Sequence, residues 1–158
     1  MGLEQEIGEL LRRKRLTLGT VESATGGLVA HMITNVVGSS EYFQGSIVSY
    51  SNDIKMKLVG VDPETLGRYG AVSEQVAGQM AAGGAKVLGV DICIADTGIA
   101  GPGGATPGKP IGLFYFGLYY SGKVHTQRRI FQGDRQENKE TAAWSALIWL
   151  RDYLAGLK

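Results

Sequence analysis

Stretches typical of buried strands and stretches typical of helices alternate along this chain of 158 residues. The predicted order is α-β-α-β-α-α-β-β-β-α, and a short turn at residues 121–123 joins the last two strands, 111–120 and 124–131, into a β-hairpin. Strands that alternate with helices indicate a mostly parallel sheet covered by helices on both faces. We therefore expect an α/β protein, a three-layer α/β/α sandwich with a mostly parallel mixed sheet that includes the hairpin.

Capping residues and turn residues set the expected boundaries of the other elements. Asp62 followed by Pro63 is typical of a helix start, and Ser73 and Asp134 each stand before a further helix. We expect helices over residues 1–15, 26–37, 52–58, 73–87 and 134–154, and strands over 16–21, 43–50 and 91–97. The long stretch between 98 and 110 reads as a loop, and loops of this length are often functional.

Length, composition and charge exclude several classes of protein. The chain fits one domain over residues 1–158 and is long enough to bury a core. Hydrophobic residues make up 44% and charged residues 20%, which argues against disorder and against a membrane class. The amphipathic stretch at 1–15 is not a signal peptide. A net charge of +1 gives no electrostatic reason to expect nucleic acid, so we expect neither a membrane nor a nucleic-acid partner.

Cysteine and histidine point to neither a disulfide nor a metal site. The single Cys93 excludes an internal disulfide and fits a reducing cytoplasm, where we expect the protein to act. His31 and His125 are far apart in sequence, with no cysteine or carboxylate at metal-ligand spacing around them. We expect no metal and no cofactor.

Three polar residues fall at the predicted carboxyl ends of strands. They are Ser23, Tyr50 and Thr97. Ligands of such sheets collect at the carboxyl ends of the strands, so we expect one shared site there. For Tyr50, which ends an alternating strand, a packing role is the alternative.

Two helix starts near these strand ends carry the most reactive residue types. Ser23 precedes Gly26 and Gly27, where backbone N–H groups of a helix start are ready to hold an anion. The alternative is that Ser23 or Thr25 is only a helix cap. Lys55 lies in the first turn of a helix, whose dipole disfavours the ammonium form, and a neutral lysine can act as a base.

A solvated surface lysine is the alternative for Lys55, and Lys57 stands close by as a second candidate. Familiar signatures are missing elsewhere: residues 103–109 match the beginning of a phosphate-binding loop, but Pro110 occupies the position that requires a hydroxyl. No dinucleotide fingerprint, nucleophile elbow or suitably placed triad histidine is present. The remaining chemistry is that of a serine with a lysine.

Five short runs carry a resemblance to a known family. They are VESATGG at 21–27, GSSEYFQGSIVSYSNDIK at 38–55, GAVSEQV at 70–76, TGIAGPGGATPGKPIG at 97–112 and FQGDR at 131–135. In order and spacing they resemble the C-terminal domain of the CinA family, over about residues 4–154. Stand-alone members of that family are nicotinamide-nucleotide amidases, which hydrolyse nicotinamide mononucleotide to nicotinate mononucleotide and ammonia in pyridine nucleotide salvage.

The resemblance implies roles for particular residues. It implies that Ser23 is the nucleophile, that Lys55 is the base and that Tyr50 assists by relaying the proton or holding the lysine. Thr97 and Arg135 resemble the family's substrate contacts, and Ser40 is a further candidate. Backbone groups of the two glycine-containing loops complete the expected substrate site: Thr25, Gly26, Gly27 and Gly101. The sequence departs from the family's pattern at Ala24 and at Ser46.

The lysine mechanism makes a demand on the fold. The pKa of Lys55 must fall from about 10.4 toward neutrality, and a helix dipole worth about 1 kcal/mol lowers it by less than one pKa unit. Burial must supply the rest.

Two other functions stay open. One is a nucleotide-binding or regulatory module without catalysis, and the other is an interaction domain that acts in competence or recombination. We also expect a homo-oligomer, with apolar residues of the last helix either in the core or at a subunit interface: Trp144, Leu147 and Trp149.

Overall fold

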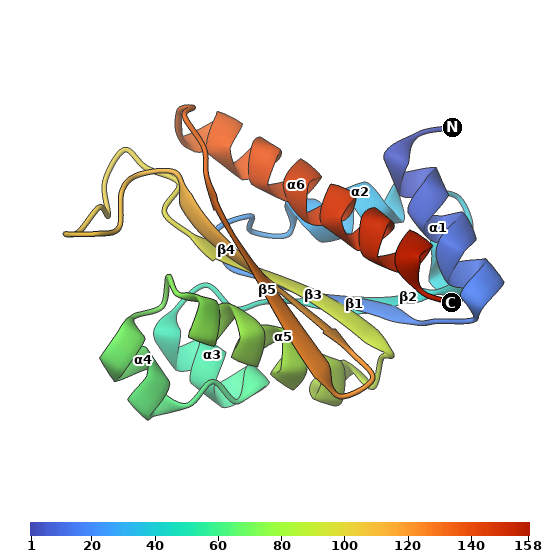
Figure 1. Cartoon of the computed structure of the whole chain (residues 1–158), viewed down its shortest axis with the longest axis horizontal. Coiled ribbons are helices and arrows are strands. Elements are labelled where there is room, and N and C mark those ends of the chain that lie inside the picture. Colours follow the sequence, from blue (N-terminus) through green and yellow to red (C-terminus); the bar gives the residue numbers. More distant parts are fainter.

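The computed structural model describes residues 1–158 and contains one five-stranded sheet with helices on both faces (Figure 1). The strand order is β2-β1-β3-β4-β5. Parallel pairs join β1 to β2 and to β3, whereas β4 is antiparallel to both β3 and β5, so four strands run one way and β4 opposes them. The predicted sandwich with a mostly parallel sheet is confirmed. The strand bounds are β1 Leu18–Glu22, β2 Phe43–Val48, β3 Ile92–Gly98, β4 Leu113–Tyr120 and β5 Lys123–Ile130.

Six α-helices form the outer layers (Figure 1). One face of the sheet is covered by α1 (Leu3–Lys14), α2 (Leu28–Thr34) and α6 (Arg135–Gly156). The other face is covered by α3 (Asn52–Val59), α4 (Pro63–Tyr69) and α5 (Glu74–Leu88). A short 3-10 turn, Ser39–Glu41, precedes β2.

Three helices, not the two of the predicted order, separate β2 from β3. The helix start predicted at Asp62 produces α4, in which the Asp62 side chain accepts a hydrogen bond from the Glu64 N–H and Pro63 takes the first position. The other predicted caps are confirmed. Ser73 accepts from the Val76 N–H, and Asp134 forms a reciprocal capping box with Glu137 at the start of α6.

The start of the second helix lies two residues later than predicted. Gly26 and Gly27 have φ angles of 62° and 104°, which a right-handed helix cannot contain and which favour glycine. They form a turn, and α2 begins only at Leu28. Since β1 ends at Glu22, residues 23–27 connect the strand to the helix as one tight, mostly buried segment.

The last helix divides its apolar residues between core and surface. Leu147 is buried in the main core, and Trp149 is half-buried against it. Trp144 and Ile148, one turn apart, remain exposed. A homo-oligomer stays a prediction, and these two side chains are the apolar surface that α6 offers to it. None of the helices combines the length and the apolar character needed to cross a membrane.

Candidate active site

The carboxyl ends of β1, β2 and β3 meet at one edge of the sheet and enclose a small cavity. Ser23 follows β1, Tyr50 follows β2, and Thr97 belongs to the end of β3. These residues line a cavity of about 250 Å³ together with Lys55, Arg135 and the loop that contains Gly101. Segments far apart in the chain thus supply a hydroxyl, an amine and a guanidinium to one site.

Lys55 and Ser23 are in direct contact inside this cavity. Lys55 is 1% exposed and Ser23 is 7% exposed, and the lysine Nζ lies 3.0 Å from the serine Oγ. Nζ also donates to the backbone carbonyls of Ser49 and Tyr50, each at 2.9 Å. A neutral amine has two N–H bonds and one lone pair. Because the carbonyls can only accept, they occupy the two N–H bonds and leave the lone pair for the serine hydroxyl.

Burial supplies the pKa change that the lysine mechanism demands. Desolvation lowers the pKa of Lys55 to about 8, and the neighbouring Asp96 works in the opposite direction. The other lysine of the helix behaves as an ordinary surface residue: Lys57 is exposed and forms an ion pair with Asp53 at 3.0 Å. Of the two lysines on this helix, Lys55 is the one that contacts Ser23.

Tyr50 contacts Lys55 through its main chain and not through its phenol. The side chain is 62% exposed, and its hydroxyl accepts a hydrogen bond from Arg135 Nη2 at 3.2 Å. Arg135 Nη1 donates to the Gly101 carbonyl at 2.9 Å, so the guanidinium connects the two loops across the mouth of the cavity. The Thr97 hydroxyl donates to the Ala71 carbonyl at 2.9 Å. Tyr50 thus contacts Lys55 through its backbone carbonyl, whereas its hydroxyl is bonded to Arg135.

The N–H groups at the start of α2 hold an anion, but that anion is the chain's own Glu22. Its buried carboxylate accepts from the N–H groups of Gly27 at 3.1 Å, Val29 at 2.9 Å and Ala30 at 3.0 Å. The Ser46 hydroxyl lies 3.2 Å from the second oxygen of Glu22. The Gly27 N–H is therefore already occupied, and the expectation that Gly27 contacts substrate stays a prediction. Ser46 belongs to the hydrogen-bonding shell of Glu22.

One amide in the turn after β1 has no hydrogen-bond partner. The Ser23 and Thr25 N–H groups donate to Asp96 Oδ1 at 3.4 and 3.2 Å, and the Gly26 N–H donates to the Ser23 carbonyl at 3.2 Å. The Ala24 N–H is left over, and Ala24 lines the cavity beside the serine. It is the donor in this turn that could stabilise negative charge on a substrate oxygen.

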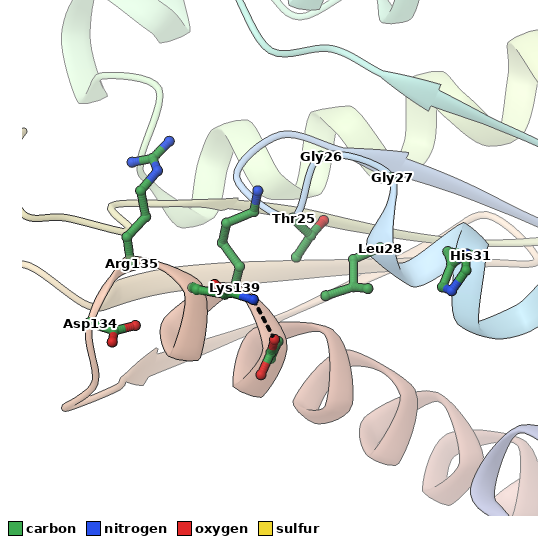
Figure 2. Close-up of a pocket in the computed structure, with 10 residues that line it drawn as sticks. Thr25, Gly26, Gly27, Leu28, His31, Asp134, Arg135 and Lys139 are labelled. Atoms are coloured by element: carbon green, nitrogen blue, oxygen red, sulfur yellow. Dashed lines mark hydrogen bonds between the residues drawn. The ribbon is translucent and has the colours of Figure 1, made fainter.

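A second, more open cavity of about 870 Å³ adjoins the first and shares Arg135 with it. It lies between the turn that carries Thr25, Gly26 and Gly27 and the first turns of α6. Figure 2 shows Lys139 extending from α6 toward this turn. The Lys139 Nζ lies 3.7 Å from the point that a Cβ on Gly26 would occupy. Neither Lys139 nor Arg135 forms a salt bridge, although the carboxylates of Asp134 and Glu140 line the same cavity.

Ser40 is the one predicted site residue that lies elsewhere. It is exposed in the 3-10 turn that precedes β2, at the amino end of that strand, whereas the cavity lies beyond the carboxyl ends. Every other predicted residue lines one of the two adjoining cavities. No group of three or more His, Cys, Asp or Glu side chains is placed to hold a metal ion.

Three charged residues of the site escaped the sequence reasoning: Glu22, Asp96 and Lys139. Glu22 and Asp96 are each 1% exposed within strands whose burial is otherwise continuous. Their signal was available, since a carboxylate inside an apolar strand is rarely buried without a partner. Lys139 carried no such signal, because a lysine in the second turn of a long helix is usually solvated.

Comparisons with known proteins place the chain in one family. The family model described as the CinA C-terminal domain matches residues 1–154. The chain is 49% identical over 148 residues to a "Putative competence-damage inducible protein" of Moorella thermoacetica, covering 94% of this chain and 36% of that protein. It is 48% identical over 158 residues to a "CinA-like protein" of Chloroherpeton thalassium, covering 98% of this chain and 38% of that one. The chain thus spans little more than a third of the length of these relatives.

Solved structures of similar proteins have the same fold. The competence damage-inducible protein A of Klebsiella pneumoniae superposes with a TM-score of 0.96 at 32% identity, over 99% of this chain and 97% of that one. The competence/damage inducible protein CihA of Agrobacterium tumefaciens gives a TM-score of 0.86 at 38% identity, over 95% and 96% of the two chains.

Proposed function

Because the chain belongs to the CinA C-terminal domain family, we propose that it is an amidase that hydrolyses nicotinamide mononucleotide to nicotinate mononucleotide and ammonia. The observation that carries the proposal is the 3.0 Å contact between Lys55 Nζ and Ser23 Oγ within the cavity. A serine is a weak nucleophile until an adjacent base takes its proton, and a buried lysine with a lowered pKa is such a base.

The acylation step follows from the positions of these two groups. The Ser23 hydroxyl transfers its proton to neutral Lys55, and Oγ attacks the carboxamide carbon. The C–N bond then breaks as the Lys55 ammonium returns the proton to the departing nitrogen, which leaves as ammonia. A water molecule, deprotonated by Lys55, attacks the resulting ester. The bond between Ser23 Oγ and the acyl carbon then breaks, the Lys55 ammonium returns its proton to Oγ, and nicotinate mononucleotide leaves as the carboxylate.

The Ala24 N–H is placed to stabilise the oxyanion of the tetrahedral intermediate. It belongs to the residue that follows the nucleophile, lines the same cavity and has no competing acceptor in the chain. Donors of this kind are typically worth about 2.7–4 kcal/mol of transition-state stabilisation. Asp96 assists indirectly, because its bonds to the Ser23 and Thr25 amides fix the turn around Ala24.

The two cavities suit the two ends of the nucleotide. The smaller one takes the carboxamide ring beside Ser23, and the larger one takes the ribose and the 5′-phosphate. Arg135 stands at the boundary between them, and Lys139 stands beyond it. Both are cations without a carboxylate partner, which favours binding of an anionic group.

Lys139→Ala is therefore expected to raise KM for nicotinamide mononucleotide by about tenfold while changing kcat little. The reason is that a phosphate contact remote from the carboxamide stabilises the bound substrate and the transition state equally. Steady-state kinetics measure both constants. Lys86→Ala, which removes an exposed lysine from α5, is the matched control and should leave both constants unchanged. An unchanged KM in Lys139→Ala would place the phosphate elsewhere.

Ammonia release from the purified chain tests the proposed function. Incubation with nicotinamide mononucleotide is expected to yield ammonia and nicotinate mononucleotide in equal amounts. Calorimetric titration with the same nucleotide separates the alternatives. Binding without ammonia release would favour a regulatory nucleotide-binding module, and absence of both would favour an interaction domain.

A further inference from the structure

The Thr25 side chain links two buried carboxyl groups that the proposed mechanism does not use. Its Oγ1 lies 2.8 Å from Glu22 Oε1 and forms a still shorter contact with Asp96 Oδ2. A threonine hydroxyl has only one proton to donate. Two ionised carboxylates therefore cannot both accept from Thr25, and one of the two contacts requires a proton from a carboxyl group.

The other hydrogen bonds identify which carboxyl carries that proton. Glu22 accepts from three backbone N–H groups of the turn and α2 at 2.9–3.1 Å, an arrangement that stabilises a negative charge. Asp96 Oδ1 accepts two longer bonds, at 3.4 and 3.2 Å, and Asp96 Oδ2 has only the contact with Thr25. The charge therefore belongs to Glu22 and the proton to Asp96.

We infer that Asp96 is held as the neutral acid, donating from Oδ2 to the Thr25 hydroxyl, which in turn donates to the Glu22 carboxylate. In this chain of two hydrogen bonds, the Asp96 carboxyl proton and the Thr25 hydroxyl proton are each donated once, so the two carboxyl groups do not compete for the Thr25 proton. Asp96 is then a positioning residue: up to neutral pH it fixes the turn that presents Ser23 without placing a full negative charge beside Lys55.

The surroundings of Asp96 agree with this state. Burial, and then the charge of Glu22, raise the pKa of Asp96 to about 7, against the lowering effect of the bonds from Thr25 and Ser23. The charged groups around it are Glu22 from β1 and Lys55 from α3. The residue paired with Asp96 on β4 is the buried, apolar Phe116, and Lys139 of α6 lies near Gly26 at the rim.

The pH dependence of stability in Asp96→Asn tests the inference by its sign. An asparagine can keep the same hydrogen bonds without a charge. An aspartic acid ionises at about pH 3.9 when unfolded but resists ionisation in this fold until near neutrality. The unmutated protein therefore loses stability as pH rises between these values, and Asp96→Asn does not. The difference in Tm, variant minus unmutated protein, should increase by several degrees from about pH 5 to about pH 8. A decrease would show an ionised Asp96 paired with Lys55 and would overturn the inference.

Infrared spectroscopy provides a second measurement that does not depend on a variant's stability. With carboxyl-labelled aspartate at about pH 6, where exposed aspartates are ionised, one protonated-carboxyl band is expected in the unmutated protein. The band should disappear in Asp96→Asn and persist in Glu22→Gln. Its absence from the unmutated protein would refute the inference. The relevance of Asp96 to catalysis rests on the proposed amidase function, but its protonation state does not. A protonated-carboxyl band without ammonia release would contradict the amidase function and still support a neutral Asp96.

Discussion

Replacing Lys55 by methionine is expected to lower kcat for hydrolysis of nicotinamide mononucleotide by about 10²–10⁴-fold, the usual contribution of a positioned general base. Methionine fills a similar apolar volume but cannot take the Ser23 proton across the 3.0 Å contact. The loss should appear in kcat more than in KM, because the lysine amine contacts the nucleophile. Initial rates of ammonia formation measure it, and circular dichroism checks that the variant is folded.

Two controls make the expected loss specific to a Ser–Lys pair. Lys57→Met removes an exposed lysine two positions away on the same short helix and should leave kcat unchanged. Ser23→Ala should be at least as damaging as Lys55→Met, and the double variant should be little worse than either single one, because residues that act as a unit are not additive. Losses that multiply in the double variant would mean that the two groups act independently.

The same pair determines how the rate responds to pH. In the unmutated protein, kcat/KM should rise with pH and level off above about 8, as Lys55 loses its proton and becomes a base. The rise depends on Lys55 and should be missing from the residual activity of Lys55→Met. If the unmutated protein showed no ionisation between about pH 6 and 9, Lys55 would not be the base.

Glu22→Ala is expected to lower the free energy of unfolding by about 3 kcal/mol, because an N–H group buried without an acceptor costs about 1–3 kcal/mol. Three N–H groups donate to this carboxylate: the bond from Val29 is buried, and those from Gly27 and Ala30 are partly buried. In a chain of this size the loss corresponds to roughly 6–12 °C in Tm. Chemical denaturation and thermal scans at one pH measure both quantities.

A matched acidic residue shows whether the effect belongs to the buried network. Glu64, exposed in the first turn of α4, makes no side-chain hydrogen bond, and Glu64→Ala should leave the free energy of unfolding unchanged. Glu22→Gln keeps one acceptor oxygen, so its free energy of unfolding should lie between those of Glu22→Ala and the unmutated protein. If Glu22→Ala were as stable as the unmutated protein, the three amides would have another acceptor.

Local chemistry in the sequence was sufficient to predict most of the fold. Ser73 and Asp134 cap helices where their side chains reach N–H groups three residues on, an interaction that needs no distant partner. The hairpin of β4 and β5 and the alternation of the earlier strands with helices have the same local origin. The error at the start of α2 also has a local reason. Gly26 and Gly27 adopt positive φ angles, a conformation that glycine permits but does not require.

The sequence by itself therefore determined the α/β sandwich and, through the family resemblance, singled out Ser23 and Lys55. Only the tertiary structure decided the chemistry of that pair. It buries Lys55, directs N–H bonds of its Nζ to the carbonyls of Ser49 and Tyr50, and places its nitrogen against Ser23, 32 positions earlier in the chain. It also fills the helix-start anion site with Glu22. Burial and hydrogen-bond direction depend on segments that meet only after folding, so residue types and spacing do not reveal them.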